Sequence, residues 1–140
     1  IPYVVENKMG IMAYGSLAHG LLSGSWSTNK TFEDDDWRAS GANFGISSWG
    51  DENLSANVAV VEKLKGIASE HGKTVSQLAI SWVLSNPAVS VALVGSTNVA
   101  HVSENLSGDW ILPETTKREI DDLVLSQGSG VGLPGMAIAT

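Results

Sequence analysis

Only two stretches of this chain have the character of buried β-strands. The first, Ile11 to Tyr14, is a short apolar run between glycines, and the second, Val89 to Val94, ends at Gly95. Short apolar runs bounded by turn residues are typical of fully buried parallel strands. Because two parallel strands cannot cover both of their own faces, the sequence predicts a sheet that needs further strands or a partner.

The segments around these runs predict helices. The expected ranges are a helix end over Pro2 to Lys8, then about Ser55 to Glu70, Thr74 to just before Pro87, Asn98 to about Leu106, and Pro113 to Gly128. Thr74 and Gln77 form a capping box, and Asn98 is a favoured N-cap residue. Two strands joined by helices make a βαβ unit, so we expect an α/β fold with parallel strands.

Each of three predicted helices carries an apolar face. The residues expected to be buried are Val60, Val61, Leu64, Ile67 and Ala68; Leu78, Ala79, Trp82 and Val83; and Ile120, Leu123 and Val124. The glycine-rich tail after Gly128 is expected to be loose.

A long segment from about Ser23 to Asn53 shows neither helical nor strand periodicity. It contains the acidic run Glu33 to Asp36 and the aromatic residues Trp26, Phe32, Trp37, Phe44 and Trp49. Structureless loops of this length are usually functional or disordered, and the aromatic residues argue against disorder. We therefore expect a lid-like loop over residues 23–53. No ligand spacing indicates a metal site, and the acidic run is expected to be solvated.

Composition excludes several classes of protein. The chain has 140 residues, of which 43% are hydrophobic and 16% charged, as in a single globular domain. A net charge of −7 without a basic cluster argues against nucleic-acid partners and anionic membranes. The absence of cysteine excludes disulfides and suits a cytoplasmic location. Because the chain starts at Ile1, we expect either processing or a longer parent protein.

Three ordered blocks of sequence resemble the aldo-keto reductases. Gly10 to Gly24 (GIMAYGSLAHGLLSG) resembles their seventh barrel strand and the loop that follows it. Gln77 to Leu84 (QLAISWVL) resembles the helix before the eighth strand. Val91 to Asn98 (VALVGSTN), with Glu104-Asn105-Leu106, resembles that strand and its cofactor-binding helix. The similarity extends to about Leu125.

The resemblance implies a partial TIM barrel. The family folds as an eight-stranded α/β barrel, an architecture of roughly 250 residues. We therefore expect residues 1–140 to be a single C-terminal segment with two short parallel strands in a helix-rich remainder. The incomplete barrel is expected to be completed by a missing N-terminal portion or covered by self-association into a dimer or larger oligomer.

The resemblance also implies a set of cofactor contacts for NADP(H). The implied residues are Tyr14 on the nicotinamide; Gly15, Leu17 and His19, with Ser16 and Gly20 in the same turn, around the pyrophosphate; Ser96, Thr97 and Asn98 at the adenosine 2′-phosphate; and Glu104 and Asn105 at the adenine. A turn of small residues lets backbone N–H groups approach phosphate oxygens, and a helix N-terminus attracts anions.

Two positions depart from the family pattern. Gly95 stands where many members have a basic residue, and His101 stands where many have an arginine that contacts the 2′-phosphate or stacks on the adenine. A guanidinium is hard to replace in such a role. The loss of positive charge at these two positions argues for weakened or lost cofactor binding. Either NADPH or NADH could then be the cofactor.

The family's catalytic Asp, Tyr, Lys and His have no counterpart here, so the resemblance implies no catalytic residue in this chain. The first hypothesis is the C-terminal part of an NAD(P)H-dependent carbonyl reductase that is inactive alone. The alternative is a stand-alone, non-catalytic oligomer that binds nucleotide or a protein partner. Without the resemblance, Tyr14 is a packing residue and Ser96 to Asn98 an ordinary helix start.

Overall fold

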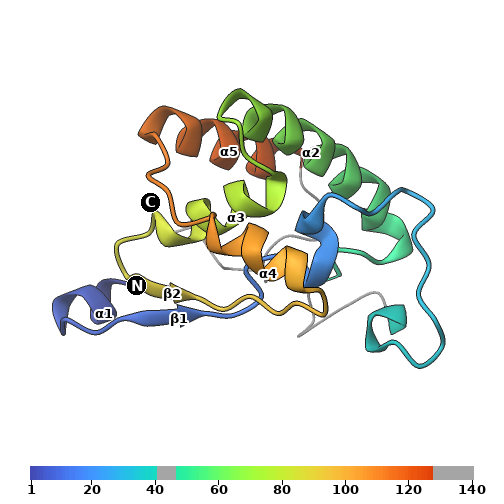
Figure 1. Cartoon of the computed structure of the whole chain (residues 1–140), viewed down its shortest axis with the longest axis horizontal. Helices are drawn as coiled ribbons and strands as arrows, with labels where there is room; N and C mark the ends of the chain where they lie inside the picture. Colours follow the sequence, from blue (N-terminus) through green and yellow to red (C-terminus); the bar gives the residue numbers. More distant parts are fainter. Residues whose placement is uncertain (41–46, 128–140) are drawn as a thin grey trace.

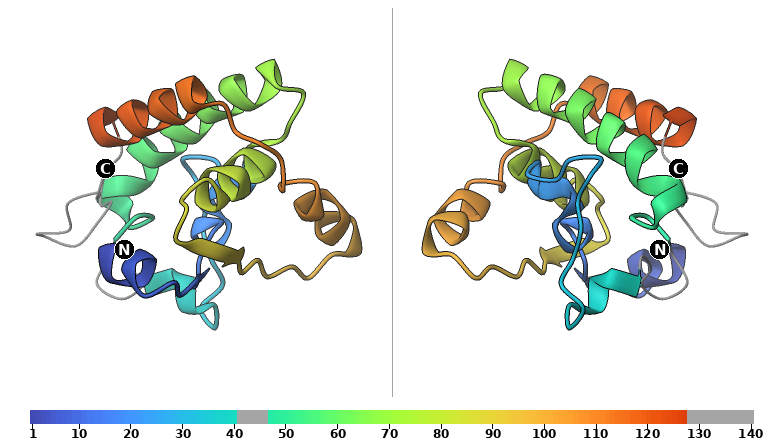
Figure 2. Two further views of the ribbon diagram at one scale, coloured as in Figure 1. Left: turned by 90° about the vertical axis from the view of Figure 1, so that its left-hand side faces the viewer. Right: turned by 90° about the vertical axis from the view of Figure 1, so that its right-hand side faces the viewer.

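The computed structural model describes residues 1–40 and 47–127. The element order is α1 (Pro2–Glu6), β1 (Ile11–Ala13), the 3₁₀ helices η1 (Ala18–Ser23) and η2 (Trp37–Ser40), α2 (Asp51–Glu70), α3 (Val75–Leu84), β2 (Val89–Ala92), α4 (Val99–Leu106) and α5 (Glu114–Gln127). Figures 1 and 2 show three tiers, with the strands at one side, α3 in the middle, and α2 beside α5 at the far side.

The two strands pair in parallel, as the sequence predicted. Ile11 pairs with Val89, Met12 with Val91 and Ala13 with Ala92, with an irregularity after the first pair. The prediction of full burial was wrong, because Met12 is 64% exposed and Val91 is 42% exposed. Helix α3 packs on β2 from one side only, so the opposite face of the sheet is open among the described residues. Both strands are also shorter than predicted.

The helix predictions were confirmed for α3 and α4. Thr74 and Gln77 form the complete capping box: the Gln77 amide donates to the Thr74 hydroxyl, and the Thr74 amide donates to the Gln77 side chain. Asn98 accepts a hydrogen bond from the Ala100 amide at 2.8 Å. Helix α2 begins at Asp51 rather than near Ser55, with Gly50 as an N-cap that offers no side-chain bond.

The segment 23–53 is less irregular than predicted. It contains the 3₁₀ helix η2 and, at its end, the first turn of α2. Trp26 and Trp49 are buried in the hydrophobic core, which anchors the segment to the helices. Phe44 and the tail after Gly128 lie outside the described residues, so the predictions for them stay predictions.

The core lies between α2, α3 and α5. The predicted apolar residues of α2 are all buried, as are Leu78 and Ile120, while the other predicted positions of α3 and α5 are half-buried. Ile80 and Ser81 are buried in addition, and the Ser81 hydroxyl donates to the Trp110 carbonyl at 2.9 Å. These contacts hold the helical layer against which β2 rests.

Candidate functional site

The carboxyl ends of both strands lie together at one edge of the molecule. The strands are parallel, and the Leu93 amide donates to the Ala13 carbonyl at 2.8 Å where they end. Tyr14 follows β1 directly, and its side chain is 70% exposed. In parallel α/β folds, ligands bind at this edge, beside the carboxyl ends of the strands. The ring predicted to contact a nicotinamide is therefore accessible.

The segment after Tyr14 is a tight turn with an unusual backbone. Gly15, Ala18, His19 and Gly20 all have positive φ angles, of 72°, 45°, 56° and 109°. The Ala18 amide donates to the Gly15 carbonyl at 2.8 Å, and the Gly20 amide donates to the Leu17 carbonyl at 3.0 Å. Ser16 is buried, and its hydroxyl donates to the Ala13 carbonyl at 3.2 Å. We call residues Gly15–Gly20 the turn.

Aromatic rings surround the His19 imidazole. Its ring centroid lies 5.6 Å from Tyr14, 5.1 Å from Trp37 and 5.4 Å from Trp49. Burial lowers the pKa of His19, and the positive charge of Arg38 lowers it further. The imidazole therefore stays neutral to a lower pH than usual, and it contributes no full positive charge beside the turn at neutral pH.

Asp36 and Arg38 form an ion pair next to His19 that sequence reasoning missed. The Arg38 guanidinium contacts both carboxylate oxygens of Asp36, and its Nη1 donates to the His19 carbonyl at 3.2 Å. Hydrogen bonds from the Arg38 side chain and backbone lower the pKa of Asp36 to about 2. The acidic run was expected to be solvated, and this holds for Glu33 to Asp35 but not for Asp36.

The second predicted group lies along α4 and on the residues just before it. Ser96, Thr97, Asn98 and His101 are exposed, and the Ser96 hydroxyl accepts from the Asn98 amide at 3.2 Å. Glu104 and Asn105 are half-buried at the other end of the helix. The Glu104 carboxylate accepts from the Thr74 hydroxyl at 2.6 Å, which ties α4 to the start of α3. The roles predicted for these residues stay predictions.

Two cavities flank the sheet. One, of about 270 Å³, lies between β2, α3 and α4, and its lining includes both Ser96 and Asn105. The structure therefore brings together one residue predicted at the 2′-phosphate and one predicted at the adenine. No residue of the turn lines this cavity, whereas Gly15 and Ser16 of the turn line the other one.

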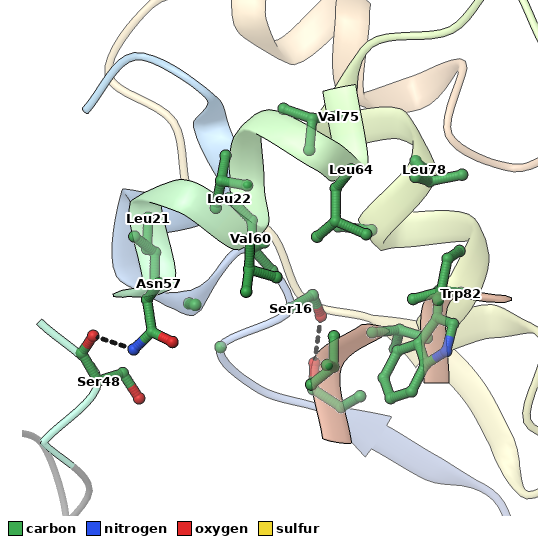
Figure 3. A pocket seen from close by; sticks show the side chains of 18 of the residues that line it. Ser16, Leu21, Leu22, Ser48, Asn57, Val60, Leu64, Val75, Leu78 and Trp82 are labelled. Atoms are coloured by element: carbon green, nitrogen blue, oxygen red, sulfur yellow. Dashed lines mark hydrogen bonds between the residues drawn. The ribbon is translucent and has the colours of Figure 1, made fainter. Parts of the chain in front are cut away.

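The other cavity, of about 300 Å³, lies between the turn and helices α2, α3 and α5 (Figure 3). Its lining is mainly apolar and includes Leu64, Leu78 and Trp82. The polar side chains at its wall already have partners: Asn57 donates to the Ser48 carbonyl at 2.6 Å, and Asp121 accepts from the Trp82 indole at 2.7 Å. This cavity offers space for apolar packing rather than acid–base chemistry.

Residues 1–40 and 47–127 provide neither a membrane-spanning helix nor a three-ligand metal site. No helix in these ranges is both long enough and apolar enough to cross a membrane. The same ranges contain no group of three His, Cys, Asp or Glu side chains placed to hold a metal ion.

Comparison with known proteins extends these observations. The model of the Aldo/keto reductase family matches residues 1–122. The aldo-keto reductase YhdN of Bacillus subtilis (strain 168) is 32% identical over 127 residues, which cover 89% of this chain and 37% of that protein. A probable voltage-gated potassium channel subunit beta of Arabidopsis thaliana is 32% identical over 129 residues, 88% of this chain and 37% of that protein.

A solved structure has the same fold over almost the whole chain. The glycerol dehydrogenase AKR11B4 of Gluconobacter oxydans aligns with a TM-score of 0.79 at 27% identity, covering 99% of this chain and 40% of that one. The chain also spans only 37% of the length of the two curated relatives described above. Its two parallel strands and their helices correspond to part of an α/β barrel. The chain belongs to the aldo-keto reductase family.

Proposed function

We propose that this chain is the C-terminal, cofactor-binding part of an NAD(P)H-dependent aldo-keto reductase that reduces a carbonyl to an alcohol. The observation that carries the proposal is the accessible Tyr14 ring beside the turn, at the carboxyl end of the two parallel strands. A bound dinucleotide supplies the hydride in such a reaction. The residues of this chain would bind and orient it, and residues elsewhere would protonate the substrate oxygen.

Three features support a dinucleotide as the ligand. Tyr14 offers an aromatic face for the nicotinamide, and the turn places small residues next to it. The start of α4 places Ser96, Thr97 and Asn98 at an exposed helix N-terminus, a position that attracts anions. Gly95 and His101 provide no permanent positive charge there, which argues for a weak preference between NADPH and NADH. A cytoplasmic location stays a prediction.

The two tyrosines of the chain provide a matched test. Tyr14 and Tyr3 are 70% and 69% exposed, but Tyr3 lies in α1, outside the site. In the intact protein that carries this chain, Tyr14→Ala should weaken NADPH binding several-fold to about tenfold, because an aromatic stacking contact is worth up to about 1.5 kcal/mol. Tyr3→Ala should leave it unchanged. Fluorescence titration measures both, and equal dissociation constants for the two variants would contradict the proposal.

Catalysis is the second test. The proposal expects no carbonyl-dependent oxidation of NADPH by the purified 140-residue chain, because the resemblance matches no residue of this chain to the family's catalytic Asp, Tyr, Lys and His. The Tyr14 ring lies 5.6 Å from the His19 imidazole, but Tyr14 matches the position that stacks on the nicotinamide rather than the proton donor. Absorbance of NADPH in the presence of an aldehyde measures the rate. Clear turnover by the isolated chain would mean that its own residues carry the chemistry.

A second candidate function is a non-catalytic module that acts through association. The open sheet face around Met12 and Val91 favours it, because exposed apolar strands are prone to pair with another chain. The two functions differ in one measurement: a reductase segment binds NADPH in the intact protein, whereas an association module changes its mass with concentration whether or not NADPH is present.

A further inference from the structure

Arg38 connects the lid-like segment to the turn. We propose that Arg38 is a positioning residue, which holds the turn Gly15–Gly20 in the shape that receives the pyrophosphate of the cofactor. The inference deepens the proposed function and rests on it for the identity of the ligand. Arg38 lies outside the three sequence blocks that resemble the family.

The guanidinium is oriented by Asp36. Its Nε donates to Oδ1 at 2.9 Å and to Oδ2 at 3.1 Å, and its Nη2 donates to Oδ2 at 2.5 Å. Such a two-pronged contact fixes the plane of the guanidinium as well as its position. The remaining nitrogen, Nη1, then donates to the His19 carbonyl at 3.2 Å. Asp36 thus holds the Arg38 guanidinium in the orientation in which Nη1 reaches the turn.

The backbone of Arg38 is anchored independently. Its carbonyl accepts a hydrogen bond from the Trp49 indole at 3.0 Å, and Trp49 is only 5% exposed. The guanidinium also lies 4.9 Å from the centre of the Phe32 ring, and the Trp37 ring packs edge-on against His19. The η2 segment is therefore attached both to the core and to the turn, so it can support the turn.

The turn has a conformation that needs support. Ala18 and His19 have φ angles of 45° and 56°, in the left-handed region that is unfavourable for residues with a Cβ. Strained residues of this kind persist only where the surroundings fix them. The bond from Arg38 ends on His19, one of the two strained residues. Its guanidinium also lies against Gly20, where an added Cβ would be 3.5 Å from Nη1.

The proposal predicts a selective loss of binding. In the intact protein that carries this chain, R38Q should weaken NADPH binding about tenfold, the equivalent of one hydrogen bond to a charged group. R38K, which keeps the charge but not the two-pronged contact, should recover part of that loss. Adenosine 2′,5′-bisphosphate lacks the pyrophosphate and the nicotinamide. Its dissociation constant for every variant should therefore stay within about twofold of its value for the original protein.

Arg118 provides the matched control. It forms an exposed ion pair with Glu114 on α5, so R118Q removes the same charge from an ion pair outside the turn and η2. Tryptophan fluorescence measures the dissociation constants of both ligands. Equal NADPH affinity in R38Q and R118Q would overturn the proposal. So would an equal loss of both ligands in R38Q, because that result indicates general unfolding rather than positioning of the turn.

A measurement without cofactor separates this inference from the proposed function. The amides of Ala18, Gly20 and Leu22 donate hydrogen bonds within the turn and η1. Hydrogen exchange at these amides should accelerate severalfold in R38Q and stay unchanged in R118Q. Unchanged exchange in R38Q would overturn the positioning role. If the original protein binds no NADPH, the proposed function fails, whereas the exchange result still decides whether Arg38 holds the turn.

Discussion

At the scale of single residues, the ion pair between Asp36 and Arg38 responds to pH in a defined direction. Hydrogen bonds from Arg38 lower the pKa of Asp36 from 3.8 to about 2. A carboxylate whose pKa is lower in the folded state stabilises that state above its unfolded pKa. The contribution is therefore complete above about pH 4, and it is lost as the pH falls through about 2.

Asp36→Asn tests this direction. The variant should melt at a lower temperature than the original protein at neutral pH, because the amide cannot make the charged contact with Arg38. The gap between the two melting temperatures should narrow as the pH falls from about 4 through about 2, because Asp36 of the original protein then takes up a proton and loses its charge. Glu114→Gln in the exposed pair of α5 serves as the control. A gap of constant size at all pH values would contradict the assignment.

Local signals explain which residue-level features were predictable. The helix caps at Thr74 and Asn98 could be predicted because each is a hydrogen bond between residues only two or three positions apart. Such local pairs can be read directly from the sequence at the start of a helix. The contact between Arg38 and His19 joins residues 19 positions apart across an irregular segment. No periodicity encodes it, so only the three-dimensional path of the segment reveals it.

At the scale of elements, two glycines have different structural roles: Gly24 lies at the end of η1, whereas Gly66 lies inside α2. Gly24 ends η1 with a φ of 75°, and a Cβ there would lie 2.8 Å from both Lys65 and Val75. Gly66 lies inside α2, and a Cβ there would have no atom of another part of the chain within 4 Å. The same substitution should therefore have opposite effects at the two sites.

Gly24→Ala should destabilise the protein by about 1–3 kcal/mol, because it combines backbone strain with a contact against the stiff Val75 side chain. Gly66→Ala should stabilise it by about 0.5–1 kcal/mol, because alanine is the better helix former. Thermal melting followed by circular dichroism measures both. A stabilising Gly24→Ala would mean that η1 is not held against α2 and α3.

Element boundaries were predictable where a side chain marks them. Helix α3 begins at a capping box and was placed correctly, whereas α2 begins after Gly50, which offers no capping side chain. Its first turn is instead closed by the Asn53 and Leu54 amides, both of which donate to the Gly50 carbonyl. The turn Gly15–Gly20 was identified through its resemblance to the family, but no periodicity in the sequence indicates its 3₁₀ geometry or its positive φ angles.

At the scale of the whole molecule, the sheet is the incomplete part of the described structure. The helices cover one face of the sheet. Met12 and Val91 in the strands, and Tyr14 and Leu93 just after them, are exposed. The number of strand-like runs predicted this imbalance, because two strands cannot enclose a barrel. The relatives, of which this chain covers 37–40%, have further chain that can supply the remaining strands.

The 140-residue chain studied alone should therefore associate through its sheet face. Light scattering should report a dimer or larger species, and Met12→Lys should shift it toward monomer, because a charge on an exposed strand opposes pairing. Leu125→Lys is the matched control: Leu125 is 62% exposed, close to the 64% of Met12, but lies on α5, at the far side from the sheet (Figure 1). A monomer at high concentration, or equal effects of the two substitutions, would show that the sheet face does not drive association.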